Sequence, residues 1–469
     1  MSQQTTKNLR YALPKLPDVV DSSIVNSLTD YVILEHLTRR LTAIDDRGVV
    51  IGDLAASWAV SENFEQFTFR LKEHQTFSDG ASIKAADVVE SFERSLRLRN
   101  AVHFDFSSIS GIKGVSDFEV QIILEAPNPN FLVSLGHPEF AALSKDDRMA
   151  DLGQQTFRCS SGVYSLGSRG QGIIRMHRNL PTGGEVLEFY ESGLLGTRHL
   201  ASSDIDVFWG PTDPSFELHQ EILASGYQAV EIPIAFTSLL TLNPLHPAMR
   251  ELSQRKLVQN SLRRLVPALE LTSPSLRPTE HIYFGTGPGR VSPEVIEKAY
   301  DLSPALPLPR PTILRILLSS EFKHTFQVAS CLESLGFQIE IETYGDFSEY
   351  AQLIIDRSKF ALIEVNNDFS SVDLTDSIFV TFNPARPLVI LPEGDSVLPL
   401  LLGQLKTTSE EPSKHALISD IGVRLIADGL VAPLFHQPLL AYVNKRWDAG
   451  AWSRHVPEVS AWKLRPTSP

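Results

Sequence analysis

The chain has 469 residues, of which 42% are hydrophobic and 21% are charged, and it contains 25 phenylalanines. This length corresponds to about three domains of about 150 residues, so we expect a globular protein with more than one hydrophobic core. The composition excludes disorder over most of the chain. The formal net charge of −14 opposes binding to a polyanion, so DNA and RNA are not expected as partners.

Membrane insertion and a disulfide framework are also excluded. The longest apolar run, residues 397–405, contains a proline and a glycine and is far shorter than the roughly 20 residues of a membrane span. Residues 1–18 lack the apolar core of a secretory signal, so we expect either an intracellular chain or one whose signal was removed. Cys159 and Cys331 are the only cysteines, and two thiols fit either redox compartment.

The first half of the chain combines strand and helix signals. Apolar residues at helical spacing predict helices over 28–41 and 82–98, and alternating residues predict strands over 67–71 and 120–124. Two short apolar runs around a glycine-rich turn predict a hairpin within 162–178. Arg39 and Arg40 at the end of the first helix fit either a solvated face or a partner for a ligand carboxylate.

From residue 311 the pattern becomes a strand–helix repeat. We expect strands over 312–318, 337–344 and 360–365 and helices over 322–335 and 347–357. The connections are long enough for parallel strands, so the sequence predicts an α/β lobe. Ligands on such sheets usually lie beyond the carboxyl ends of the strands, here after Val365. The proline-rich segment 302–311 reads as an extended linker into this lobe.

Residue patterns that would indicate catalysis or a metal site are absent from the sequence. The run GTGPGR at 285–290 fits neither a dinucleotide-binding nor a P-loop pattern, and it reads as an ordinary turn. No two of the 13 histidines lie within five residues of each other, and neither HExxH nor GxSxG occurs. We therefore expect a binding protein without cofactor or metal rather than an enzyme, although a site assembled from distant residues stays open.

Residues 54–96 resemble the signature block of the family 5 extracellular solute-binding proteins, the oligopeptide, dipeptide and nickel receptors of ABC importers. The block consists of Leu-Ala-x-Ser-Trp-x-Val-Ser, a Phe-x-Leu strand, Phe-x-Asp-Gly, and a helix that begins Ala-x-Asp-Val. These positions are Leu54, Ala55, Ser57, Trp58, Val60 and Ser61, then Phe69 and Leu71, then Phe77, Asp79 and Gly80, then Ala86, Asp87 and Val88. The resemblance continues at residues 161–164, 205–207, 242–247 and 431–442.

The resemblance implies an α/β protein of the two-lobed periplasmic-binding-protein type II-like fold (cluster C), with an extra subdomain in lobe one. Lobe one is expected over residues 1–238, with 36–150 as the extra subdomain, and lobe two over 239–433 as an inserted α/β lobe. Residues 434–469 are expected to return to lobe one. Two strands that cross between the lobes are expected near 238–243 and 431–435.

The resemblance also suggests a ligand site in the loop after the third α/β strand. Asp368 and Phe369 match an acidic–aromatic pair whose aspartate, in peptide-binding members, pairs with the amino group of the ligand. Asn366 and Asn367 precede this pair in the same loop. An exposed loop acid or a helix cap remains an alternative role for Asp368.

Three further side chains are candidates for ligand contact. Asn243 follows the first crossing strand, and Tyr164 and Trp209 offer flat apolar walls with one polar group each. Both aromatic residues also fit core packing.

The function implied by the family is capture of a peptide or another amine-bearing small solute by hinge closure between two lobes. The partners would be that ligand and the membrane subunits of an ABC importer. The protein itself is expected to be a monomer that does not span the membrane, and to be periplasmic or extracellular if a signal was removed. The alternative is an intracellular ligand sensor derived from the same fold.

Overall fold

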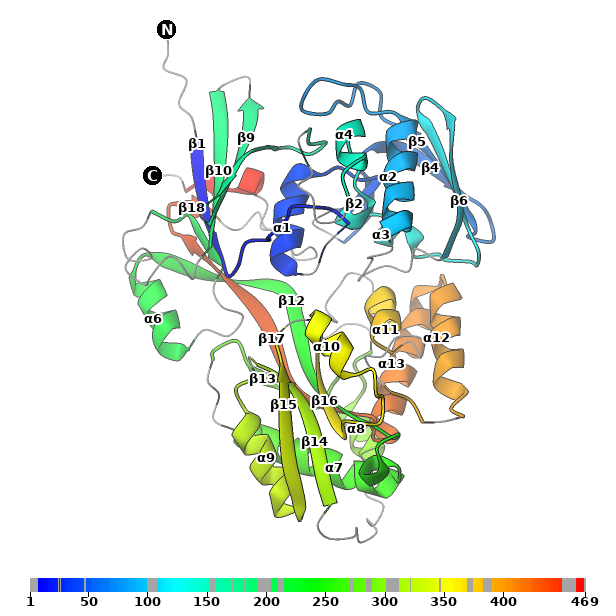
Figure 1. Cartoon of the computed structure of the whole chain (residues 1–469), viewed down its shortest axis with the longest axis vertical. Helices are drawn as coiled ribbons and strands as arrows, with labels where there is room; N and C mark the ends of the chain where they lie inside the picture. The colour runs from blue at the N-terminus through cyan, green and yellow to red at the C-terminus, as the bar shows by residue number, and fades with distance from the viewer. Residues whose placement is uncertain are drawn as a thin grey trace. The chain divides into compact units, whose positions relative to one another are not determined.

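The computed structural model of the chain describes most of its length, in segments. These are residues 7–23, 25, 27–45, 48–98, 108–151, 157, 159–170, 172–180, 183–191, 204–209, 215–269, 271, 273–283, 289–300, 312–320, 322–345, 347–368, 374–382, 390–392, 394–448 and 461–467. The proline-rich segment 302–311 lies outside them. Figure 1 shows the elements in chain order.

The chain forms two compact units. Unit 1 consists of Met1–Pro233 and Leu439–Pro469, and unit 2 of Ile234–Pro438. The chain passes between them inside two long strands, β12 (Tyr227–Leu242) and β17 (Val431–Asn444). Because each crossing lies within a continuous strand, no loop marks it in the sequence. The expected boundaries at 238/239 and 433/434 lie five residues further into unit 2.

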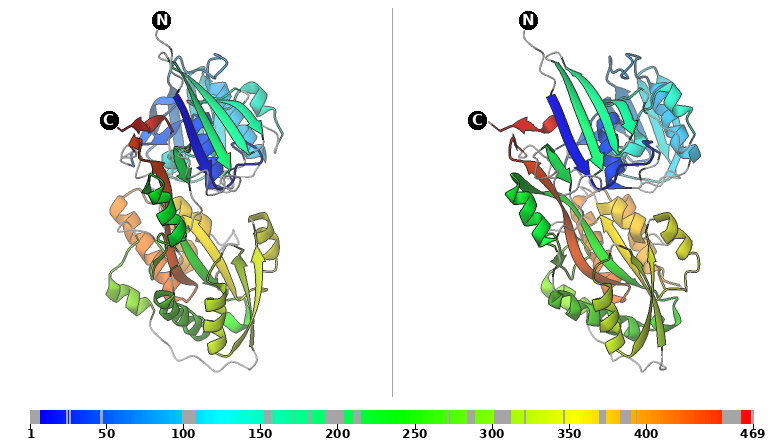
Figure 2. Two further views of the ribbon diagram at one scale, coloured as in Figure 1. Left: turned by 90° about the vertical axis from the view of Figure 1, so that its left-hand side faces the viewer. Right: turned by 60° about the vertical axis from the view of Figure 1, so that its left-hand side comes forward.

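The main sheet of unit 1 is built around β1 (Lys7–Leu13), which runs parallel to both of its neighbours. These neighbours are β10 (Gly183–Glu191) and β11 (Val207–Trp209), and β11 pairs with the end of β17. Beyond β10 lie β9 (Ile173–Leu180) and β8 (Ser165–Gly170), which form the hairpin predicted from the sequence. Figure 2 shows these strands side by side.

A second, four-stranded antiparallel sheet in unit 1 has the order β4–β5–β7–β6. Its strands are β4 (Ala55–Val60), β5 (Gln66–Leu71), β6 (Ile109–Ser116) and β7 (Glu119–Leu124). Helix α2 (Ala85–Leu98) covers it, and alternating side chains such as Phe67, Phe69, Val120 and Ile122 form a core with Phe92 of the helix. The predicted strands and this helix are confirmed.

Helix α1 (Leu28–Leu37) is shorter than predicted. Its C-cap Thr38 is extended (φ −118°, ψ 152°), and Gly162 N and Tyr164 N donate to the carbonyls of Leu37 and His36. A Cβ atom on Gly162 would lie 2.4 Å from the carbonyl carbon of Leu37. The predicted end at residue 41 was wrong because a distant backbone segment closes off the last turn.

The sheet of unit 2 has the order β15–β14–β16–β12–β17, and the short β13 (Arg277–Pro278) also pairs with β17. Strand β14 (Thr312–Ser319) runs parallel to β15 (Phe337–Tyr344) and β16 (Leu362–Asp368). The connecting helices are α9 (Thr325–Ser334) and α10 (Phe347–Leu353). The parallel βαβαβ arrangement predicted from the sequence is confirmed.

Helices complete both units. Unit 2 also contains α7 (Leu252–Leu265), α8 (Pro293–Ala299), α11 (Leu374–Phe382), α12 (Val397–Thr407) and α13 (Glu411–Ala427). Unit 1 also contains β2 (Thr42–Ile44), β3 (Val50–Gly52), α3 (Phe131–Ser134), α4 (Lys145–Arg148), α6 (Phe216–Ala224), β18 (Trp447–Asp448) and β19 (Arg465–Pro466). In unit 2, α7 and α9 pack with β14 in one core, and α8 and α11–α13 form another.

Candidate functional site

The end of β16 is where the sequence places the ligand loop. The structure continues the strand through Asn366–Asp368, which pair with Phe236–Ser238 of β12 in antiparallel register. The loop expected from residue 366 was therefore wrong, because the long β12 still offers backbone partners there. Asn366 is exposed. The side chains of Asn367 and Asp368, and the whole of Phe369, lie outside the described residues.

The ends of the three parallel strands of unit 2 are tied together by polar contacts. The backbone N–H of Ser319 in β14 donates to Glu364 Oε2 in β16 at 2.7 Å. Tyr344 Oη in β15 donates to the carbonyl of Glu364 at 3.4 Å. Burial raises the pKa of Tyr344 well above its ordinary value, so its hydroxyl remains a hydrogen-bond donor at neutral pH. These contacts fix the strand end from which Asn366–Asp368 extend.

A buried histidine joins the two crossing strands on the unit 2 side. His436 of β17 meets Thr237 Oγ1 of β12 at 3.0 Å through Nδ1 and Thr279 Oγ1 at 2.8 Å through Nε2. Burial lowers the pKa of His436 to about 3, and the positive charges of His281, Arg290 and Arg277 lower it further. At neutral pH the ring is therefore uncharged, with one nitrogen donating and the other accepting.

Sequence reasoning missed this histidine clamp. A signal for it exists, since His436 and Gln437 interrupt an otherwise apolar strand. Polar residues at buried strand positions are expected to be hydrogen-bonded.

Tyr164 belongs to the core of unit 1. It is 1% exposed, and its hydroxyl donates to Glu185 Oε2 at 2.9 Å. Arg178 Nη1 lies 3.5 Å from the same Glu185 oxygen, and the rings of Tyr164 and His36 are 5.5 Å apart. Burial raises the pKa of Tyr164 well above its ordinary value. The side chain thus lies within a buried polar network.

Asn243 holds the turn that follows β12. Its Nδ2 donates to the carbonyls of Arg357 at 2.6 Å and Phe360 at 2.7 Å, and its Oδ1 accepts from Leu245 N at 3.0 Å. The residue is 1% exposed. Its amide therefore anchors the entry into β16, which gives the hydrophobic–Asn pair a structural role.

Trp209 ends β11 and is 4% exposed. Its Nε1–H is buried and has no acceptor among the residues that the structure describes. Residues 210–214 lie outside these. A buried indole N–H without a partner costs free energy, so this donor is suited to an acceptor supplied by a ligand or by neighbouring chain.

Among the described residues, no cluster of three or more His, Cys, Asp or Glu side chains could hold a metal ion. In the same part of the chain, no helix combines the length and the apolar character required to cross a membrane.

Comparisons with known proteins identify the fold and the family. Residues 49–179 match the model of the bacterial extracellular solute-binding proteins, family 5 middle. The chain belongs to this family. A probable D,D-dipeptide-binding periplasmic protein of Escherichia coli is 28% identical over 173 residues, and a dipeptide-binding protein of Lactococcus lactis is 26% identical over 162 residues. These alignments span 34% and 31% of this chain but only 33% and 29% of the relatives' own length.

Solved structures of solute-binding proteins match the whole chain. NikA from Brucella suis in complex with Fe(III)-EDTA superposes with a TM-score of 0.81, 16% identity, and coverage of 98% of this chain and 100% of that chain. A dipeptide-binding protein from Pseudoalteromonas in complex with Met-Leu gives a TM-score of 0.77, 16% identity and coverage of 98% and 100%. At this identity the likeness establishes the fold, and the predicted periplasmic-binding-protein fold is confirmed.

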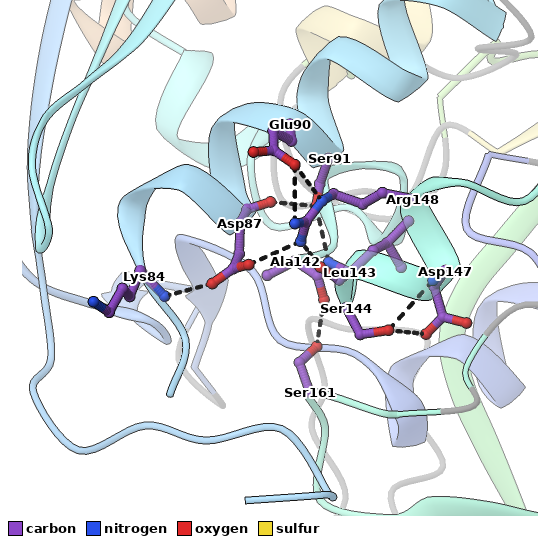
Figure 3. A network of polar contacts seen from close by, with 10 residues as sticks. All are labelled: Lys84, Asp87, Glu90, Ser91, Ala142, Leu143, Ser144, Asp147, Arg148 and Ser161. Carbon is purple, nitrogen blue, oxygen red and sulfur yellow. Dashed lines mark hydrogen bonds and ion pairs between the residues drawn. The ribbon is translucent and has the colours of Figure 1, made fainter. Parts of the chain in front are cut away.

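The family 5 signature residues at 77–88 build the start of α2. Asp79 Oδ1 accepts from Ala81 N at 2.9 Å in a turn where Gly80 has φ +89°. Asp87 Oδ2 accepts from Lys84 N at 2.8 Å, and its Oδ1 accepts from Arg148 Nη1 at 2.9 Å. Figure 3 shows Arg148 between Asp87 and Glu90. These residues are explained by the folding of the small sheet and its helix.

The Ile-Asp-hydrophobic segment of the family has a similar explanation. Asp206 is 1% exposed and binds groups from three segments of unit 1. Its Oδ2 accepts from Arg10 N at 2.8 Å, and its Oδ1 accepts from Arg446 Nε at 2.9 Å and from Trp447 Nε1. The carboxylate therefore joins the strands at the chain start, β11 and the return of β17.

Proposed function

We propose that the chain is the substrate-binding receptor of an ABC importer and that its two units close around a peptide or another amine-bearing small solute. The observation that carries the proposal is the match of almost the whole chain to structures of solute-binding proteins. The curated relatives are named as dipeptide-binding or periplasmic proteins, which favours this role over an intracellular ligand sensor. The receptor would work as a monomer outside the cytoplasm, deliver its ligand to the importer's membrane subunits and release it chemically unchanged.

We propose that units 1 and 2 act as the two lobes, with residues 36–150 as an extra subdomain of the first. The chain passes between the units only within β12 and β17 in the residues described, and strands at a crossing can bend without breaking core contacts. The clamp made by His436 with Thr237 and Thr279 supports this, since it joins β12 to β17 within a few residues of both crossings.

Asp368 is the proposed partner of the ligand's amino group. It is the last residue of β16, beyond the polar contacts that tie the parallel strands, and so lies where ligands of α/β sheets usually bind. Asn366 and Asn367 would add hydrogen bonds, and Phe369 and Trp209 would form apolar walls. Asn243 and Tyr164 would support the site from behind, because their polar atoms already have protein partners.

Binding to matched ligands tests the proposal. A dipeptide and its N-acetylated form differ by the ammonium group, so titration of the purified chain with both measures the contribution of the ammonium. We expect the free dipeptide to bind at least about 100-fold more tightly, since a carboxylate paired with a desolvated ammonium contributes about 3–5 kcal/mol. Ligand at 100 times its Kd should stabilise the fold by about 2.7 kcal/mol.

Variants then assign the contact. Asp368→Asn should abolish the preference for the free dipeptide, whereas Asp356→Asn, which changes an acid bonded to Ser358 on the same unit, should retain it. Equal binding of both ligands by the wild type would disprove the role of Asp368. No stabilisation by any member of a panel of peptides and small amines would refute the receptor function.

A further inference from the structure

A group of basic side chains surrounds the histidine clamp of unit 2. Arg277 of β13 lies directly opposite His436 of β17 in an antiparallel pair, so both side chains project from the same face of the sheet. Thr279, two residues further along, meets His436 Nε2 at 2.8 Å and accepts from His281 N at 3.0 Å. The backbone and hydroxyl of Thr279 thus connect the two histidines.

Arg290 is fixed beside this group by a constrained glycine. Gly289 has φ +82°, and a Cβ atom there would lie 2.2 Å from Tyr283 Cδ2 and 2.6 Å from Ile418 Cγ2. The glycine backbone therefore packs directly against the buried Tyr283 ring, and this contact sets where Arg290 begins. The charge of Arg290 acts on both His281 and His436, in the same direction as that of Arg277 on His436.

The local electrostatics are positive in a chain whose net charge is −14. The acid adjacent to His281 is Glu280, and its carboxylate accepts two hydrogen bonds from Arg263 at 2.8 and 3.0 Å. His281 Nδ1 is buried without a hydrogen-bond partner among the described residues. An anion placed here would accept from these donors and offset the repulsion between the cations.

We propose that unit 2 carries a binding site for a small oxyanion, a carboxylate or phosphate group, formed by Arg277, Arg290 and His281 around Thr279. Guanidinium groups match the planar geometry of a carboxylate and the oxygens of a phosphate, and they keep their charge at all physiological pH values. The site lies within unit 2 and does not depend on the receptor function, because it can bind an anion whether or not peptides bind elsewhere.

Titration of the full-length chain with inorganic phosphate and, separately, with acetate tests this site. The readout is the side-chain NMR resonances of His281 and His436, with those of His219 in unit 1 as the reference. We expect saturable shifts of the two unit 2 histidines with at least one anion, and the anion that binds more tightly identifies the preferred group. No saturable shift with either anion would overturn the proposal.

Matched variants locate the anion. Arg277→Gln and Arg290→Gln should each weaken binding at least tenfold, whereas Arg315→Gln, an exposed arginine of β14 that pairs with Glu340, should leave it unchanged. Both proposed arginines are exposed, so their replacement is expected to preserve the fold, and the His219 resonances check this. Equal anion affinity in all three variants would refute the site. Failure here, with peptide binding intact, would leave the receptor function untouched.

Discussion

The replacement Asp206→Ala should destabilise unit 1 more than any exposed acid could. The variant leaves the backbone N–H of Arg10 and the indole N–H of Trp447 without their acceptor inside the protein. Each buried donor left unsatisfied costs about 1–3 kcal/mol, so the expected loss in the free energy of unfolding is about 2–6 kcal/mol. The guanidinium of Arg446 adds little, because this side chain is half exposed and regains water.

Urea denaturation of the full chain, followed by circular dichroism, measures this loss. Glu221→Ala is the matched control, since it removes an exposed acid from α6 of the same unit and should change stability by less than about 0.5 kcal/mol. Arg446→Ala should cost at most about 1 kcal/mol. If Asp206→Ala lost less than 1 kcal/mol, or if Arg446→Ala cost as much, the hub role of Asp206 would be wrong.

Three further predictions concern single buried groups. Gly162→Ala should lose about 1–3 kcal/mol or more because its Cβ would overlap the end of α1, whereas Gly111→Ala, which has open space, should be near neutral in the same denaturation assay. Lys256→Met should lose about 3 kcal/mol because its ammonium donates to two helix-end carbonyls, and the exposed Lys298→Met should not. Burial lowers the pKa of His36 to about 4, so protons bind the unfolded chain first and stability should fall by about 1.4 kcal/mol per pH unit from pH 6.5 to about 4. His36→Gln should flatten this dependence, and an unchanged slope would disprove its origin.

The sequence predicts the regular elements well where one period dominates. The β14–α9–β15–α10–β16 order follows from alternating strands and helical spacing, and only the ends differ by a few residues. The end of α1 could not be predicted, because it depends on the close approach of Gly162 from more than a hundred residues away. Arg40, expected on a solvated face or at a ligand carboxylate, is 3% exposed and pairs with Glu35. This pair forms because the chain leaves the helix before Arg40.

The candidate site was harder to predict than the fold. Local periodicity gave no sign that β16 would continue to Asp368, because the partner that extends it is the far end of β12. Asn243 was singled out by its motif, yet its amide is used by three backbone groups that only the folded chain brings together. A motif match identifies a position that matters but does not separate a ligand contact from a structural one.

The most direct test of the account is a distance measurement between the two units with and without ligand. The chain has one cysteine in each unit, Cys159 and Cys331, so spin labels can be attached without introducing new thiols. Pulsed electron paramagnetic resonance should show a broad distance distribution in the ligand-free protein and a shorter, narrower one with the ligand that native mass spectrometry finds bound. An unchanged distribution at saturating ligand would contradict closure of the two units.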